Sequence, residues 1–162
     1  MSGQLENYRI READTDDALA ISRLIVPLTE QYILPDVSPD ARQGLLNSMS
    51  EQGLQKLMSD GCRYHLAEMD AQTIAVIGLY RHSHLYHLFV AAEFQRRGIA
   101  RRLWEVVLNQ CIEAGAGDAI SVNAAPTARR FYERLGFKSR GDARQRNGIT
   151  TLPMVYAINT RK

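Results

Sequence analysis

The segment Phe94-Gln95-Arg96-Arg97-Gly98-Ile99-Ala100-Arg101-Arg102 decides how the rest of the chain is interpreted. It follows the apolar run Leu88-Phe89-Val90 and opens an amphipathic stretch, so we predict a strand, a tight turn and a helix start. The first N–H groups of a helix lack intrahelical partners and carry partial positive charge. Gly98 lets the backbone approach a ligand closely, because it has no side chain. With four arginines around the turn, the segment predicts a seat for a phosphorylated ligand, or else a strand–helix turn with solvated arginines.

The composition is that of an ordinary globular domain. The chain has 162 residues, of which 45% are apolar and 23% charged, and we expect one domain over residues 1–162. The net charge of +2 makes the arginine cluster a local feature, so we expect no nucleic-acid partner. No apolar run approaches the ~20 residues of a membrane span, and the first residues lack a secretion signal. Cys62 and Cys111 show no metal-like spacing and no disulfide framework. We therefore expect a cytoplasmic protein without a membrane partner.

Hydrophobic periodicity predicts an α/β (α+β) fold. Helices are expected after the capping residues Asp14, Ser38 and Ser50 and at about 98–114 and 126–135, with Pro27 kinking or shortening the first. Asn147-Gly148 is a strong hairpin turn signal. Strands are expected at residues 8–12, 64–69, 73–80, 84–90, 119–123, 137–140 and 150–158.

The strand at 84–90, the helix after it and the strand at 119–123 favour a parallel pair. We expect a mixed, mostly antiparallel sheet of about six or seven strands with about four flanking helices. Simple alternation would place His82, His84, Tyr86 and Leu88 on one face of the strand and His87 on the other.

Two blocks of the chain resemble the GNAT superfamily of acyl-CoA-dependent N-acyltransferases. Leu88-Phe89-Val90 with Gln95-Arg96-Arg97-Gly98-Ile99-Ala100 resembles the acyl-CoA signature of that family, in which Gln or Arg, two residues, Gly, one residue and Gly or Ala follow a strand. Asn123 and Ala128, followed by Phe131-Tyr132-Glu133-Arg134-Leu135-Gly136-Phe137, resemble its second block. The order of elements also matches, least well at residues 31–60, where such proteins often build the acceptor site. The resemblance implies an N-acetyltransferase that uses acetyl-CoA, with a GNAT-like sheet in which 84–90 and 119–123 splay apart.

The resemblance also implies where acetyl-CoA binds. Backbone amides from about Arg96 to Arg101 would hold the pyrophosphate, and the pantetheine arm would lie like an added strand in the splay. Arg97, Arg101 or Arg102 could reach the 3′-phosphate. The implied cofactor-binding residues are Leu88, Phe89, Val90, Gln95, Arg96, Arg97, Gly98, Ile99, Ala100, Arg101, Asn123 and Tyr132.

Acetyl transfer to an amine needs a base for the ammonium, a donor for the oxyanion and an acid for the thiolate. By resemblance, Tyr132 is the general acid and the backbone N–H of Val90 is the oxyanion donor. His84 is the candidate base, because an imidazole has an ordinary pKa near 6.5; water or capture of the rare neutral amine are the alternatives. We expect direct attack in a ternary complex, because nothing supports a thiol nucleophile.

The acceptor is expected to be a primary amine of a small molecule, an amino acid derivative or a peptide. Its candidate walls are Tyr32, Ile33, Tyr86 and the hairpin at 144–147, and Glu30, Asp36 and Glu68 could attract a cation. Residues 150–158 could form a homodimer contact, as in some relatives. An acyl-CoA-binding sensor without turnover is the alternative function.

His82 and His84 could share a zinc ion, being two residues apart on a strand. The expected alternation turns His87 away and leaves no third ligand, so we expect no metal.

Overall fold

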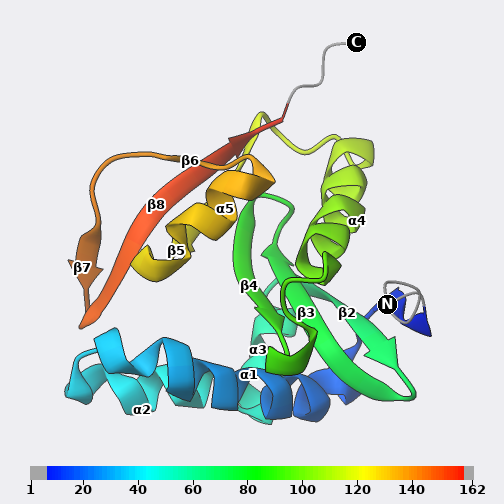
Figure 1. The fold of residues 1–162 in the computed structure, drawn as a ribbon, viewed down its shortest axis with the longest axis horizontal. Coiled ribbons are helices and arrows are strands. Elements are labelled where there is room, and N and C mark those ends of the chain that lie inside the picture. The colour runs from blue at the N-terminus through cyan, green and yellow to red at the C-terminus, as the bar shows by residue number, and fades with distance from the viewer. Residues whose placement is uncertain (1–6, 159–162) are drawn as a thin grey trace.

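The computed structural model describes residues 7–158 and shows one sheet with helices on both faces (Figure 1). The α-helices are α1 (Ala18–Tyr32), α2 (Pro39–Ser48), α3 (Glu51–Ser59), α4 (Ile99–Glu113) and α5 (Arg129–Leu135). The strands are β1 (Arg9–Glu12), β2 (Cys62–Met69), β3 (Gln72–Tyr80), β4 (His84–Val90), β5 (Ala119–Ala124), β6 (Lys138–Ser139), β7 (Arg144–Arg146) and β8 (Ile149–Ala157). The predicted fold class is confirmed, with eight strands and five α-helices within the described residues instead of about six or seven strands and about four helices. None of these helices combines the length and apolar character that crossing a bilayer requires.

The strands lie in the order β1-β2-β3-β4-β5-β8-β6, with β7 paired to β8. Every pair is antiparallel except β4 and β5, so the predicted parallel pair is confirmed. Helix α4 provides the crossover that a parallel connection requires. The β4–β5 pairing covers only His84 opposite Ser121 and Leu85 opposite Val122. The two strands therefore part after two residues, as the expected splay requires.

Each face of the sheet has its own apolar core. On one face, Trp104 of α4 packs against Phe137 and Tyr156 at ring-centroid distances of 5.0 and 5.2 Å, and Tyr132 of α5 packs into the same cluster. On the other face, Ile21 and Ile25 of α1 and Leu54 of α3 are fully buried against Tyr64 and Leu66 of β2. Burial of these large side chains supplies the main driving force for folding.

Within the secondary structure, the expected hairpin has a different first arm and α1 is not shortened. Asn147 and Gly148, with φ of 55° and 80°, form the expected turn, but its first arm is β7 rather than the strand expected at 137–140. β7 is missed because Arg144-Gln145-Arg146 has no apolar alternation, and the expected strand shrinks to β6. Of the kink or shortening expected at Pro27, the shortening does not occur: α1 continues to Tyr32 and buries Leu28 and Thr29.

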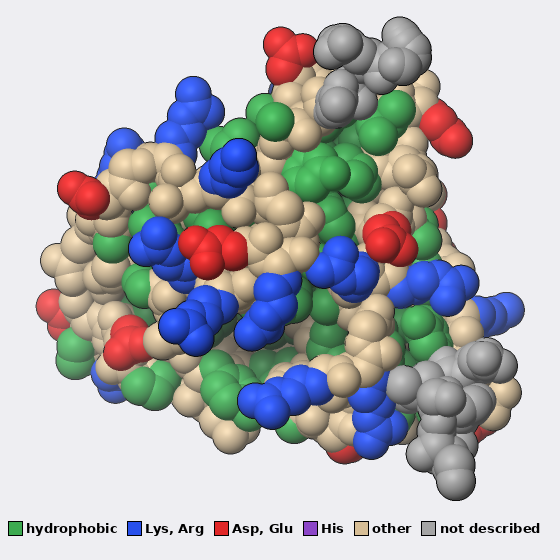
Figure 2. Space-filling model, turned by 45° about the horizontal axis from the view of Figure 1, so that its top comes forward, with side chains coloured by type: hydrophobic (Ala, Val, Ile, Leu, Met, Phe, Trp, Pro, Cys, Tyr) green, Lys and Arg blue, Asp and Glu red, His purple; other side chains and the backbone are tan. Residues whose placement is uncertain are grey.

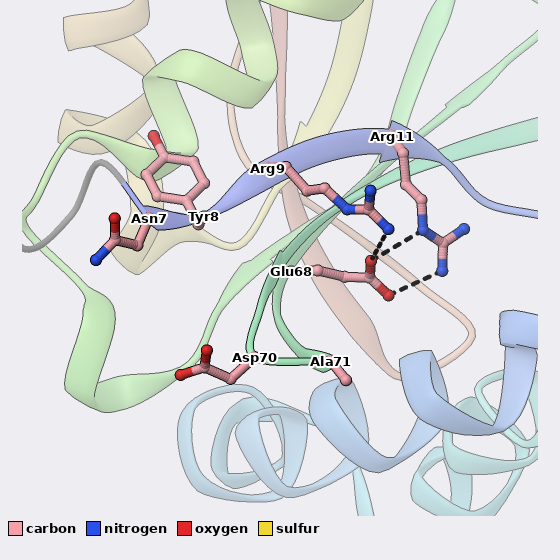
Figure 3. Close-up of a pocket in the computed structure, with 7 residues that line it drawn as sticks. All are labelled: Asn7, Tyr8, Arg9, Arg11, Glu68, Asp70 and Ala71. Atoms are coloured by element: carbon pink, nitrogen blue, oxygen red, sulfur yellow. Dashed lines mark hydrogen bonds and ion pairs between the residues drawn. The ribbon is translucent and has the colours of Figure 1, made fainter.

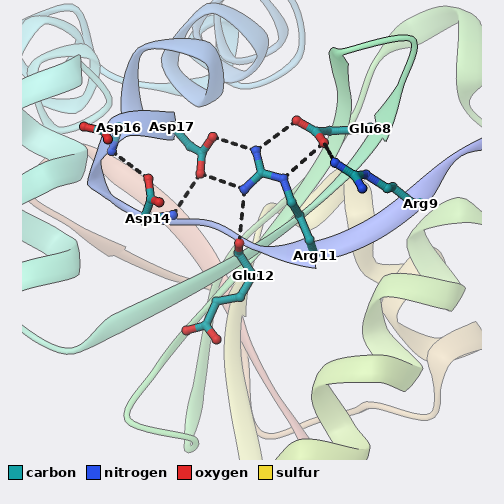
Figure 4. A network of polar contacts seen from close by, with 7 residues as sticks. All are labelled: Arg9, Arg11, Glu12, Asp14, Asp16, Asp17 and Glu68. Atoms are coloured by element: carbon teal, nitrogen blue, oxygen red, sulfur yellow. Dashed lines mark hydrogen bonds and ion pairs between the residues drawn. The ribbon is translucent and has the colours of Figure 1, made fainter.

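A polar network fastens β1 to β2 and to the start of α1 (Figure 4). The Arg11 guanidinium donates to both carboxylate oxygens of Asp17, at 3.0 and 2.8 Å, and to both of Glu68, at 3.1 and 2.9 Å. Asp17 also accepts from the backbone N–H of Asp14, whose own carboxylate caps the backbone N–H of Asp16. These hydrogen bonds from Arg11 are the largest cause of the lowered pKa of Asp17 and of Glu68.

We predict that Arg11→Met destabilises the protein by about 2 kcal/mol near neutral pH, because two carboxylates lose charge-assisted hydrogen bonds. Both carboxyl pKa values are lowered, so the stabilisation is present above about pH 4 and lost as the pH falls further. Urea unfolding at about pH 7 and about pH 3 measures both effects.

Arg9→Met is the matched control. The Arg9 side chain is 77% exposed and makes one 3.5 Å contact with Glu68, so its loss should cost under about 0.5 kcal/mol. Equal losses in the two variants would contradict the assignment of the network to Arg11.

Candidate functional site

A β-bulge at Tyr86 shapes the middle of β4. In the β3–β4 register His87 lies opposite Gly78 and Leu85 opposite Leu79, so Tyr86 is an extra residue. A bulge shifts the side-chain alternation. The prediction that His87 faces away from His84 is therefore wrong: Tyr86 and His87 lie on one side with ring centroids 4.6 Å apart. Leu88 packs into the core of the opposite face, so its predicted face is also wrong.

At the end of β4, backbone groups that have no strand partner point towards the splay between β4 and β5. The backbone N–H of Ala91 donates to the Ile74 carbonyl of β3 at 2.8 Å. Alternate residues of an antiparallel strand point to opposite sides, so the N–H and C=O groups of Leu88 and Val90 point away from β3. The Val90 carbonyl accepts from the Gln95 side-chain amide at 2.9 Å, which ties the following turn to the strand end. The Val90 N–H therefore faces the side on which β5 departs.

The turn before α4 is open and left-handed. Arg96 and Gly98 have φ of 64° and 84°, and Gly98 is the residue before the helix. The Arg102 N–H makes a first-turn hydrogen bond, at 3.0 Å to the Gly98 carbonyl, so the N–H groups of Ile99, Ala100 and Arg101 have no intrahelical partner. A Cβ at Gly98 would meet no atom within 4 Å. The turn therefore has the geometry of an anion-binding helix start.

The arginines around the turn differ in their contacts. Arg101 donates to the carbonyl of Arg134 at the end of α5, at 2.6 Å, whereas Arg97 lies 5.9 Å from the centroid of the Phe94 ring. Arg96 and Arg102 are exposed. Figure 2 views the molecule with the top of Figure 1 turned towards the reader, and Lys and Arg side chains gather across the face that it shows.

Tyr132 and Asn123 come from neighbouring elements. Tyr132 lies on α5, which ends at Gly136 with a φ of 108°. Its ring packs between Phe131 and Phe137, and burial raises the pKa of its hydroxyl, which therefore stays protonated near neutral pH. Asn123 is exposed near the end of β5.

The two histidines of β4 have different hydrogen-bond partners. His84 is half-buried, its Nδ1 lies 2.7 Å from Ser121 Oγ, and burial lowers its pKa. The Nδ1 of His87 lies 2.8 Å from the Tyr64 hydroxyl, and burial lowers the pKa of His87 to about 4. Ser121 and Tyr64 are absent from the sequence-based site, because only the strand register brings them beside the histidines.

The candidate acceptor walls are partly brought together. The Ser38 N–H donates to the Gly148 carbonyl at 2.9 Å, which joins the segment after Tyr32 to the β7–β8 hairpin. Tyr32 and Tyr86 are both exposed. Glu68 instead belongs to the Arg11 network. It lines a surface depression at the β1 edge of the sheet, separated from β4 by β2 and β3 (Figure 3).

His82 lies in the β3–β4 turn with a φ of 61°, so it is not a strand neighbour of His84. In residues 7–158 no group of three or more His, Cys, Asp or Glu side chains is arranged to hold a metal ion. Cys62 and Cys111 are both buried and free.

Comparison with known proteins identifies similar sequences and folds. Residues 33–158 match the family described as acetyltransferase (GNAT) domain. A GCN5-related N-acetyltransferase from Rhodopseudomonas palustris is 17% identical with a TM-score of 0.77, over 93% of this chain and 95% of that chain. PaiA N-acetyltransferase from Thermoplasma acidophilum, in complex with coenzyme A, is 15% identical with a TM-score of 0.76, over 93% and 99%. A spermidine N-acetyltransferase chimera from Vibrio cholerae and hSSAT is 19% identical with a TM-score of 0.64, over 93% and 95%. The search of curated proteins gives no match.

We predict that His87 makes stability depend on pH between about 6.5 and 4. The unfolded chain takes up a proton at His87 near pH 6.5, whereas the folded chain does so only near pH 4, so stability falls as the pH falls through this range. The loss attributable to His87 is about 3 kcal/mol.

His87→Gln is the comparison variant, because glutamine can still accept from Tyr64 but does not titrate. Urea unfolding across this pH range should show the wild-type protein losing the additional stability. Parallel curves for the two proteins would contradict the low pKa of His87.

Proposed function

The chain belongs to the acetyltransferase (GNAT) domain family, and we propose that it is an N-acetyltransferase that moves the acetyl group of acetyl-CoA to a primary amine. The observation that carries the proposal is the free backbone edge of Leu88 and Val90 beside the open helix start at Gly98. The coenzyme A complex of the Thermoplasma acidophilum enzyme, which has a similar fold, supports the cosubstrate.

The cofactor would use both parts of this surface. The pyrophosphate would accept from N–H groups of the turn between Arg96 and Arg101, where positive φ angles and a helix start favour an anion. The amides of the pantetheine arm would pair with the outward-facing N–H and C=O groups of Leu88, as an added strand does. Asn123 at the end of β5 would contact the arm from across the splay.

Transfer would proceed by direct attack in a ternary complex. The neutral amine forms a C–N bond to the thioester carbonyl, and the oxyanion accepts a hydrogen bond from the Val90 N–H. As the C–S bond breaks, the Tyr132 hydroxyl gives its proton to the sulfur, and a proton from the former amine returns to the phenolate through solvent. The balance is one ammonium and one acetyl-CoA converted to one amide, one CoA thiol and one proton.

The proposal is tested by incubating the protein with acetyl-CoA and a panel of small amines, amino acid derivatives and short peptides while following free thiol. Amine-dependent thiol release with formation of the acetylated product supports it. Tight binding of acetyl-CoA without turnover of any amine would favour a sensor, and the absence of binding would overturn both functions.

We predict that Gly98→Val raises the Kd for acetyl-CoA at least about tenfold, or ~1.4 kcal/mol. Its side chain would occupy the open surface where the pyrophosphate would bind. Calorimetric titration with acetyl-CoA measures the change.

Gly115→Val is the matched control at the other end of α4. Gly115 has a φ of 73°, and its Cβ would also meet no atom within 4 Å, so valine is comparably strained at both sites. Equal affinities for the two variants would overturn the assignment of the turn.

We predict that Tyr132→Phe lowers kcat by roughly 10²-fold, because the leaving thiolate loses its proton donor. The KM for acetyl-CoA should change little, since the ring and its packing remain. Steady-state kinetics with the most active amine from the panel give both constants.

Tyr156→Phe is the control, because Tyr156 contacts the same Phe137 ring, at a centroid distance of 5.6 Å, but belongs to β8. This variant should keep its kcat. An unchanged kcat in a folded Tyr132→Phe protein would remove Tyr132 from the mechanism.

A further inference from the structure

The short contact between His84 and Ser121 follows from the parallel register of β4 and β5. The two residues are directly paired, and Ser121 Oγ lies 2.7 Å from His84 Nδ1. The Ser83 carbonyl lies 2.9 Å from the Ser121 backbone nitrogen and 3.4 Å from Ser121 Oγ. The serine hydroxyl therefore has two neighbours, the ring nitrogen and a carbonyl oxygen.

A carbonyl oxygen can only accept a hydrogen bond, so one arrangement of the protons satisfies both contacts of the Ser121 hydroxyl. When the Ser121 hydroxyl donates to the Ser83 carbonyl, its oxygen can accept the Nδ1–H of His84. A neutral imidazole carries one N–H, so Nε2 then has a free lone pair. In the reverse arrangement Nε2 would carry the proton and could accept none.

His87 lies on the same side of β4 as His84, but its hydrogen-bond partner is the hydroxyl of Tyr64. The Tyr64 hydroxyl lies 2.8 Å from His87 Nδ1, and its other side-chain partner is the thiol of Cys62. When the protonated phenol donates to Nδ1, the proton of neutral His87 is on Nε2. In that arrangement His87 is a hydrogen-bond donor rather than a base, although it lies beside Tyr86 on the same side as His84.

We propose that Ser121 is a positioning residue that holds His84 in the Nδ1–H tautomer, with Nε2 free to accept a proton from the ammonium form of the acceptor. This inference rests on the proposed acetyl transfer, because it assigns the base of that reaction. In the step, an N–H bond of the ammonium breaks and an Nε2–H bond forms. The free amine then attacks, and the imidazolium keeps its Nδ1–H bond to Ser121 until it releases the proton to solvent.

Nitrogen-15 NMR of the ring nitrogens tests the tautomer directly, without any acceptor. At about pH 8, above the ordinary histidine pKa, wild-type His84 should carry its proton on Nδ1. Ser121→Ala should shift the population towards Nε2–H, and Ser121→Thr should restore Nδ1–H. Ser83→Ala is the control, since the Ser83 hydroxyl donates to the Tyr80 carbonyl rather than to the ring. An Nε2–H tautomer of His84 in the wild-type protein overturns the proposal.

Kinetics test the consequence for catalysis. Ser121→Ala should lower kcat roughly tenfold, less than the 10²–10⁴-fold that a general base supplies, with little change in KM for acetyl-CoA. Ser121→Thr should recover most of the loss. An unchanged kcat in Ser121→Ala overturns the positioning role. If the wild-type protein holds the Nδ1–H tautomer but acetylates no amine, the proposed function fails and the catalytic role fails with it, whereas the structural assignment stands.

Discussion

The extra residue in β4 is the constraint on which the candidate site depends. Before the bulge at Tyr86, β4 pairs with both β3 and β5; after it, β4 pairs with β3 alone. A bulge adds local twist and bends the strand, while β5 continues beside β8 along all six of its residues. The N–H and C=O groups of Leu88 and Val90 then lack a strand partner. Backbone polar groups need partners, so this edge suits either water or a ligand with amides of its own.

The same bulge also sets the position of the His87 side chain, and Gly78 of β3 makes room for its partner, Tyr64. Gly78 lies opposite His87, and the Tyr64 ring occupies the space where a Cβ of residue 78 would be. Only glycine at position 78 therefore leaves room for the Tyr64 ring, whose hydroxyl lies beside His87. The bulge thus leaves a backbone edge without a strand partner and places His84 and His87, which have different hydrogen-bond partners, on the same side of β4.

Much of the fold could be predicted from the sequence because its main elements have strong local signals. The turn at Gly98, the parallel strands around α4 and the Asn147-Gly148 turn are all marked by apolar periodicity or by residues that tolerate positive φ. The side of β4 on which His87 lies could not be predicted. Alternation assumes a regular strand, and Tyr86 has no sequence feature that marks a bulge. Ser121 was missed for a related reason: its role depends on the register between strands separated by a whole helix.

The near-neutral net charge hides an uneven distribution, with an acidic first part of the chain and a basic later part. Residues 1–93 contain 7 Lys and Arg against 13 Asp and Glu, whereas residues 94–148 contain 11 against 5. Several acids of the first part are neutralised locally, as Asp17 and Glu68 are by Arg11. The excess of positive charge lies in the part of the chain that forms the helix start, α5 and the β7 arm. A field of this kind raises the local concentration of a polyanion such as acetyl-CoA, and ionic strength weakens it. Exposed arginines would therefore mainly speed encounter, whereas the fixed N–H groups after Gly98 would set the geometry of the bound phosphates, because backbone donors need no rotamer ordering.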